Sequence, residues 1–272
     1  MRCPPRLLRL PAATGGFTLI EILIAVSIFF IVLFAVYTAF ESSRTTFAAG
    51  EQKADIQQTA RLAMELMEQD LRLVGYGLPP EAGSAIEAAT PTSISFRADL
   101  LNASTIFAED YVGGTTLKVE DASGIQSQDT IFLMNGGQWD ALEVTEVNTS
   151  DNPHTITTAS AAADDYPWAA QVGRPLTVTY CSCAETNTEP PVWACAANAT
   201  TLCKDEGDAA GLQPLADNIQ SLQFAYFDEE DVATNNRDDI RRIVITVTVQ
   251  SPPGWWRPQV FSMESDVRPR NL

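Results

Sequence analysis

Residues 16–40 read GFTLIEILIAVSIFFIVLFAVYTAF, and this stretch decides how the chain is organised. From Phe17 to Phe40 it carries a single charge, Glu21, and it is long enough to span a bilayer, which requires about 20 apolar residues. Arginines precede it in a segment that has no acidic residue: Arg2, Arg6 and Arg9. The positive-inside rule therefore predicts a cytoplasmic N-terminus and a body on the far side of the membrane.

The small-residue pair Gly15-Gly16 stands before the apolar run. A secretory signal peptide differs, because its apolar core is shorter and its small-residue cleavage site follows that core. The small residues Ala48-Ala49-Gly50 follow the apolar run, so the alternative of a signal peptide cleaved there stays open. We predict a removed leader over residues 1–16, cut between Gly16 and Phe17.

The presence of Glu21 in this apolar segment requires an explanation, because a carboxylate inside a membrane span costs roughly 2.5–3.5 kcal/mol on insertion scales. One interpretation is a helix-end carboxylate that reaches water. The other interpretation depends on the cleavage after Gly16, which frees the amine of Phe17. In an assembly, Glu21 of one subunit then pairs with the Phe17 amine of a neighbour, and each charge offsets the desolvation of the other.

The stretch Gly16-Phe17-Thr18-Leu19-Ile20-Glu21 resembles the cleavage and methylation motif of type IV prepilins and of type II secretion pseudopilins. The resemblance implies cleavage at Gly16 by prepilin peptidase, N-methylation of Phe17, and assembly into a helical filament. The implied partners are other pilin and minor pilin subunits, the peptidase, the assembly platform and inner-membrane lipid. Major pilins carry a proline in the mature helix where this chain has Thr38.

No proline occurs between Phe17 and Pro79, so one helix is predicted to continue from the transmembrane part, residues 17–40, into an amphipathic part, residues 41–75. Its apolar stripe is expected to pack on a sheet: Ile56, Ala60, Ala63, Met67, Leu71 and Val74.

Residues 76–272 are predicted to form a β-rich periplasmic or extracellular body. Short β-branched segments separated by turn residues predict strands at Ser93–Arg97, Thr115–Val119, Thr130–Met134, Ala141–Val147, Pro175–Cys181, Ile219–Phe227 and Ile240–Gln250. The fold class is therefore α+β, a long spine helix packed on a mainly antiparallel sheet.

Looser patterns resemble PilW-type minor pilins: residues 69–77 at the helix end, residues 219–228, residues 240–244 and residues 268–271. This resemblance implies a minor pilin that takes part in pilus assembly, in a tip or priming complex. J-type pseudopilins of type II secretion share the layout and stay open as an alternative. A tip-displayed adhesive module is the other alternative.

Cys3 lies in the leader, and the remaining cysteines cluster: Cys181, Cys183, Cys195 and Cys203. An exported chain meets an oxidising compartment, which favours two disulfides over a zinc site, and C-x-C is not the usual zinc-knuckle spacing. The disulfides would staple an insertion at residues 181–203 and tie down Pro190–Asp208. Three connectivities are open. We prefer nested pairs, Cys181 with Cys203 and Cys183 with Cys195, on the expectation that the two C-x-C residues point to opposite faces.

The formal net charge of −18 disfavours nucleic acid as a partner. The single histidine, His154, is expected in a loop without a nucleophile motif, so no catalytic residue, no cofactor and no enzyme activity are predicted. No metal site is predicted either. The acidic residues 228–231 and 238–239 leave a calcium-binding site open as an alternative. A solvated hairpin loop is the simpler interpretation of these residues. An adhesive patch stays a hypothesis for four tryptophans: Trp168, Trp193, Trp255 and Trp256.

Overall fold

The structure is a computed structural model, and it describes residues 18–186, 188, 192–208, 210–252 and 258–272. Gly16, Phe17, Cys3 and the pair Trp255-Trp256 lie outside the described residues, so the predictions made for them stay predictions. The chain divides into two compact units, residues 1–51 and residues 52–272. We describe each unit by itself.

Helix α1 spans Leu19–Leu71, which is 53 residues, and it begins in the first unit and ends in the second. In the first unit every side chain from Leu19 to Phe40 is exposed. By length and composition α1 can cross a membrane, and none of its most apolar segment is buried within the chain. A helix that is apolar on all sides requires lipid or other subunits around it.

The helix ends at Leu71, slightly before the predicted limit. Short-range hydrogen bonds tighten the next turn, where Leu73 N–H donates to Asp70 O at 2.9 Å and Val74 N–H donates to Leu71 O at 3.4 Å. Gly75 and Gly77 follow with φ of +80° and +79°, the left-handed region that glycine adopts without a steric penalty.

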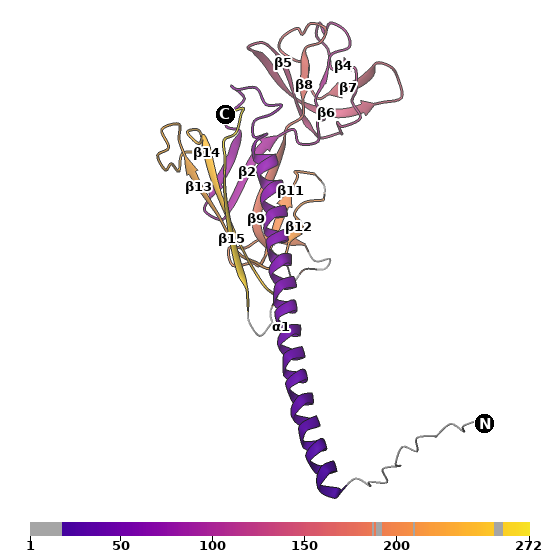
Figure 1. The fold of residues 1–272 in the computed structure, drawn as a ribbon. Helices are drawn as coiled ribbons and strands as arrows, with labels where there is room; N and C mark the ends of the chain where they lie inside the picture. Colours follow the sequence, from indigo (N-terminus) through magenta and orange to yellow (C-terminus); the bar gives the residue numbers. More distant parts are fainter. Residues whose placement is uncertain (1–17, 187, 189–191, 209, 253–257) are drawn as a thin grey trace, which may run out of the picture. The chain divides into compact units, whose positions relative to one another are not determined.

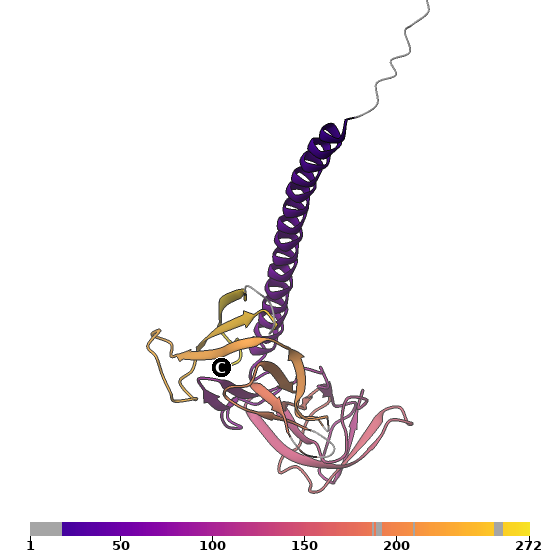
Figure 2. The ribbon, with the colours of Figure 1, turned by 90° about the horizontal axis from the view of Figure 1, so that it is seen from below.

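In the second unit the predicted apolar stripe is confirmed, because Ile56, Ala60, Ala63, Met67, Leu71 and Val74 are all buried. They share one core with two antiparallel sheets. The first sheet has the order β1 (Ile86–Thr90), β2 (Ser93–Ala98), β9 (Leu176–Glu185), β11 (Thr201–Asp205) and β12 (Gln213–Ala216), with β10 (Trp193–Cys195) also beside β9. The second has the order β13 (Ile219–Phe227), β14 (Arg242–Gln250) and β15 (Val260–Val267). Figures 1 and 2 show the two sheets as separate layers.

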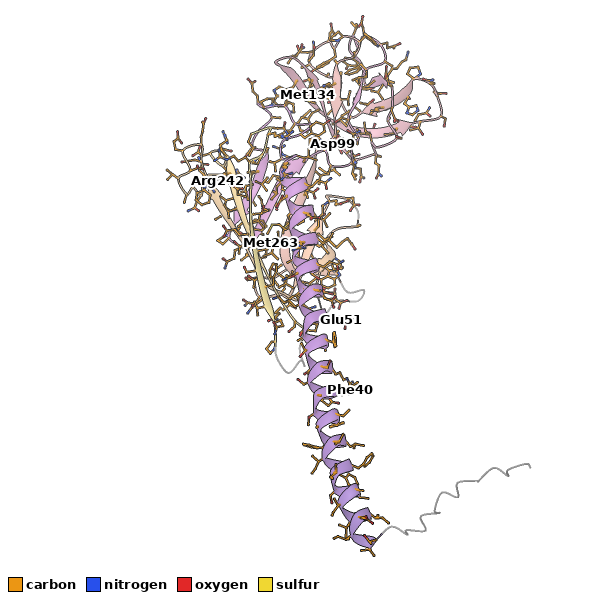
Figure 3. All side chains as sticks on the ribbon, viewed as in Figure 1. Phe40, Glu51, Asp99, Met134, Arg242 and Met263 are labelled. Carbon is orange, nitrogen blue, oxygen red and sulfur yellow. A yellow bond between two sulfur atoms is a disulfide. The ribbon has the colours of Figure 1, made fainter. Side chains whose placement is uncertain are left out.

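Residues 99–175 form a module of their own, which we call the insert. Its sheet has the order β3 (Thr105–Ile106), β8 (Gln171–Gly173), β5 (Thr130–Asn135), β6 (Gln138–Asn148), β7 (His154–Thr158) and β4 (Thr116–Val119). A second hydrophobic core, which contains Phe107, Leu133 and Tyr166, belongs to the insert alone. Figure 3 shows Asp99 at the base of the insert and Met134 within it.

The predicted α+β class is confirmed, as a long apolar helix followed by antiparallel sheets. Each of the seven predicted strands coincides with an observed one, with bounds that differ by a few residues. The alternation predicted for the last of them is confirmed in β14, where Ile243, Ile245, Val247 and Val249 are buried.

Candidate functional site

The N-terminus of α1 is closed by a reciprocal cap. The backbone N–H and the hydroxyl of Thr18 both donate to Glu21 Oε2 at 2.9 Å, and the Glu21 N–H donates to the Thr18 hydroxyl at 3.3 Å. This is a capping box, in which the N-cap residue and the third helical residue satisfy each other's free backbone donors. Glu21 therefore has a local partner within its own chain.

The rest of the apolar segment also bonds its polar side chains internally. The Ser27 hydroxyl donates to Leu23 O at 2.8 Å, and the Thr38 hydroxyl donates to Ala35 O at 2.9 Å. Polar groups in hydrocarbon must be satisfied within the segment, because water is absent there. These bonds leave aliphatic and aromatic side chains as the outer surface of the helix.

Gly16 and Phe17, the predicted cleavage and methylation residues, lie outside the described residues. Thr18 is a capping residue of this site that our sequence reasoning missed. The signal was present in the sequence, because Thr-x-x-Glu directly before an apolar run is the pattern of a capping box.

Disulfides join Cys181 to Cys195 and Cys183 to Cys203, with Cα–Cα distances of 5.7 and 5.8 Å. The nested pairing that we preferred is wrong. Its premise fails, because residues two apart in a strand project to the same face, and both Cys181 and Cys183 are buried on β9. Each of them lies close to both neighbouring strands, and each disulfide links diagonal neighbours instead of direct register partners.

The disulfides tie β10 and β11 to β9, and a buried polar cluster ties β9 and β11 to α1. The Tyr180 hydroxyl donates to Asp70 Oδ2 at 2.5 Å, and Lys204 Nζ lies 2.8 Å from the same oxygen. Glu206 Oε1 lies 2.7 Å from Lys204 Nζ. Burial raises the pKa of the Tyr180 hydroxyl, and the charge of Asp70 raises it further. Burial alone would lower the pKa of Lys204, but the two carboxylates outweigh it and the pKa is raised.

Two of the stretches that resemble PilW-type minor pilins, residues 69–77 and residues 268–271, meet at the end of the helix, and we call residues 75–77 the junction. Asn271 Nδ2 donates to Val74 O at 3.3 Å, and Gly75 N–H donates to Arg97 O at 2.9 Å. The Asp99 N–H donates to Tyr76 O at 3.0 Å, where the chain enters the insert. The helix end, the first sheet, the insert and the C-terminal residues are thus joined at one place.

The other candidate residues have structural roles. His154 opens strand β7 instead of lying in a loop, and its Nδ1 accepts a hydrogen bond of 2.9 Å from Ala122 N–H. In the acidic loop, a hydrogen bond from Arg242 holds the pKa of Asp231 below its ordinary value, and Arg268 adds to the effect. Among the described residues, no group of three or more His, Cys, Asp or Glu side chains is arranged to hold a metal ion.

Two tryptophans from the proposed adhesive patch fall among the described residues. Trp168, in the insert, is 62% exposed. Trp193 is half-buried on β10 and packs against the disulfide cysteines. Trp168 precedes β8 in the insert, whereas Trp193 lies on β10 beside β9, so the two tryptophans come from different parts of the fold.

Residues 12–37 match the model of the prokaryotic N-terminal methylation motif. No curated protein and no solved structure matches the chain. The match covers the end of the predicted leader and most of the apolar segment, including the Thr18–Glu21 capping box. The chain therefore carries a prepilin signal, which indicates a type IV pilin-like protein that is processed as a prepilin.

Proposed function

We propose that the chain is a minor type IV pilin, cleaved between Gly16 and Phe17, methylated on Phe17 and assembled through its apolar helix into a pilus tip or priming complex. The observation that carries this proposal is the single carboxylate, Glu21, at the start of a fully exposed apolar helical segment and inside the residues that match the prepilin signal. A structural, non-enzymatic subunit is what such a signal indicates.

Glu21 has two partners in this proposal at different stages. Before assembly, Thr18 supplies local hydrogen bonds. After cleavage, the amine of Phe17 on a neighbouring subunit becomes the ionic partner in the apolar filament core. Removing one member of a buried ion pair costs about 3–5 kcal/mol, whereas losing an N-cap costs about 1 kcal/mol. The two roles can therefore be separated by mutation.

The test compares Glu21→Val with Thr18→Val in the full-length chain. Both variants remove the capping box, but only the first removes the carboxylate. We expect Glu21→Val to be processed and inserted normally and to be depleted from sheared filaments, whereas Thr18→Val still enters them. Glu51→Val, which removes an exposed carboxylate of α1 beyond the apolar span, is the matched control.

Equal recovery of all three variants in the sheared-filament fraction would contradict an assembly role for Glu21. Equal depletion of the Thr18 and Glu21 variants would mean that helix capping alone matters. The processed N-terminus is checked by mass spectrometry of the filament fraction, and a start other than methylated Phe17 would contradict the cleavage proposal.

The insert supports a second candidate, a tip-displayed binding module. It has its own sheet and its own core, which the packing of α1 does not require. Loss of piliation on deletion of the whole gene would favour the assembly role, and normal pili with lost attachment would favour the binding role. A type II secretion pseudopilin of the J type is distinguished by loss of protein secretion in the same deletion strain.

A further inference from the structure

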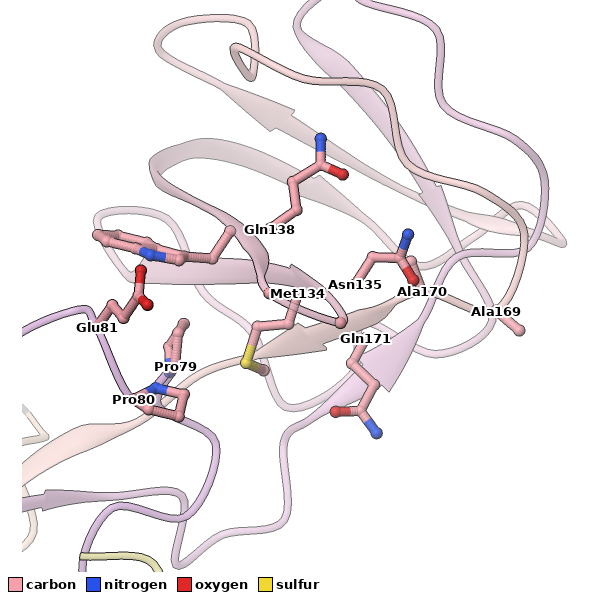
Figure 4. A pocket seen from close by; sticks show the side chains of 12 residues that line it. Pro79, Pro80, Glu81, Met134, Asn135, Gln138, Ala169, Ala170 and Gln171 are labelled. Atoms are coloured by element: carbon pink, nitrogen blue, oxygen red, sulfur yellow. The ribbon is translucent and has the colours of Figure 1, made fainter.

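A groove of about 520 Å³ lies between the loop that follows α1 and the insert. Residues 79–81 line one side, and residues 134–139 and 169–171 line the other. Figure 4 shows the Met134 side chain directed from β5 toward Pro79 and Pro80. The groove is therefore built jointly by the insert and by the loop beside the junction.

The floor of the groove is apolar and is held in place by packing. Trp139 is half-buried, and its ring lies 6.3 Å from the ring of Phe132, between centroids. Trp139 is the direct register partner of Met134, so both side chains lie on one face of the β5–β6 hairpin. Pro79 is buried. Trp139 thus offers a fixed aromatic surface at the groove.

Polar side chains surround that floor: Glu81, Asn135, Gln138 and Gln171. None of these four makes a side-chain hydrogen bond to another described residue. Gly136 and Gly137, at the hairpin turn, have open space where a Cβ would lie, so the backbone is also accessible there. The groove presents amide donors, amide acceptors and a carboxylate that the described part of the chain leaves free for a ligand.

The charges of the groove and of the whole chain limit the class of ligand that the groove can bind. None of the described residues that line the groove is Lys, Arg or His. Glu81 contributes a negative charge, and the whole chain has a net charge of −18. Anionic ligands are repelled by such a surface. A proline-rich peptide, another ligand that packs on tryptophan, offers few donors to Glu81 and the amide oxygens, because proline has no backbone N–H. A neutral ring that carries several hydroxyl groups satisfies both the aromatic floor and the polar rim.

We propose that this groove binds a neutral saccharide, with one face of a sugar ring on Trp139 and hydroxyl groups on Glu81, Gln138 and Gln171. This site goes beyond the assembly role and does not depend on it. Failure of the filament test above leaves the binding test below unaffected, and the reverse also holds.

The test uses the full-length chain in a detergent without a sugar headgroup, applied to an array of neutral and of sialylated or sulfated glycans. We expect binding to neutral glycans only. For a glycan found in this way, titration calorimetry of Trp139→Ala should show an affinity about tenfold lower or worse. Trp168→Ala is the matched control, because Trp168 is more exposed but does not line the groove.

Trp139→Ala also removes packing on Phe132, so variants of exposed residues provide an independent measure. Gln171→Ala and Glu81→Gln should each lower the affinity about two- to tenfold without a change in melting temperature. Three results would overturn the proposal: no neutral glycan bound, an affinity that Trp139→Ala leaves unchanged, or preferential binding of a proline-rich peptide in a parallel titration.

Discussion

Ala98, the last residue of β2, lies directly opposite Leu176, the first residue of β9. The chain therefore leaves the first sheet and returns to it at adjacent positions, with the whole insert between them. A short hairpin turn between Ala98 and Leu176 would allow the same pairing of β2 with β9. The insert is topologically an enlarged β2–β9 turn with a core of its own, although Leu100 at its start also packs against the core around α1.

The first prediction follows from this relationship. Replacing residues 99–175 by Asn-Gly, a preferred two-residue hairpin turn, should leave the remainder of the second unit folded. Loss of hydrogen bonds at the junction, such as that from Asp99 N–H to Tyr76 O, should cost no more than about 2 kcal/mol. Urea denaturation and thiol titration check it. An aggregated product with reactive cysteines would show that the insert is required for folding.

The second prediction concerns Tyr180→Phe. The variant keeps the ring but removes a hydrogen bond to the Asp70 carboxylate, so stability at pH 7 should fall by about 1.5–3 kcal/mol. Tyr76→Phe, on an exposed ring, is the control and should be neutral. The measurement is the midpoint of urea denaturation under oxidising conditions.

The same cluster predicts a loss of stability in alkali. The folded-state pKa values of Tyr180 and Lys204 are both raised, so the stability they contribute is complete below their ordinary values, near pH 10, and is lost as the pH rises further. The slope of stability against pH above 10 should be shallower in Tyr180→Phe than in the wild type. Equal slopes would show that the Tyr180 hydroxyl is not responsible.

The third prediction separates the observed disulfides from the nested alternative. In Cys195→Ser the partner left with a free thiol should be Cys181, and in Cys203→Ser it should be Cys183. Alkylation followed by fragment mass spectrometry identifies the labelled residue. Each variant should lose about 3 kcal/mol, the value for a loop of about 15 residues. Labelling of Cys183 in Cys195→Ser would restore the nested pairing.

The fourth prediction concerns Gly173, the last residue of β8. A Cβ there would meet the carbonyl oxygen of Gly77 and, at 2.9 Å, the Met134 side chain. Gly173→Ala should therefore destabilise the chain by about 1–3 kcal/mol, the usual cost of overpacking. Gly137→Ala is the control, because its Cβ meets nothing within 4 Å and its φ is not positive. Equal melting temperatures for both variants would contradict the close approach at the junction.

The long helix was predictable because several signals agree on it: an apolar span, no proline before Pro79 and a helical stripe of buried residues from Ile56 onward. Strand β14 was predictable because its two faces differ along its whole length. The neighbouring strand β15 was missed, because its partly buried side chains, such as Phe261 and Met263, alternate with polar ones in a largely exposed pattern. Local pattern is informative only where burial contrast is strong.

The insert could not be recognised from the sequence, because its strands, like those of the other sheets, are short segments separated by turn residues. What separates it is the pairing of Ala98 with Leu176, a contact between residues far apart in the chain. The groove depends on the same long-range arrangement, since Glu81 and Trp139 come from different parts of the fold. The disulfide connectivity was missed for a different reason, an incorrect assumption about the faces on which Cys181 and Cys183 lie.

The junction also decides where the protein can be labelled for microscopy. Asn271 bonds to Val74, and Leu272 packs against the core, so an epitope or fluorophore placed beside them would disturb the site where the helix, the first sheet and the insert are joined. Gly113 and Gly114 lie in an exposed loop of the insert with open space around them. A tag introduced between these two glycines would report the position of the subunit on the cell while leaving the contacts of the junction intact.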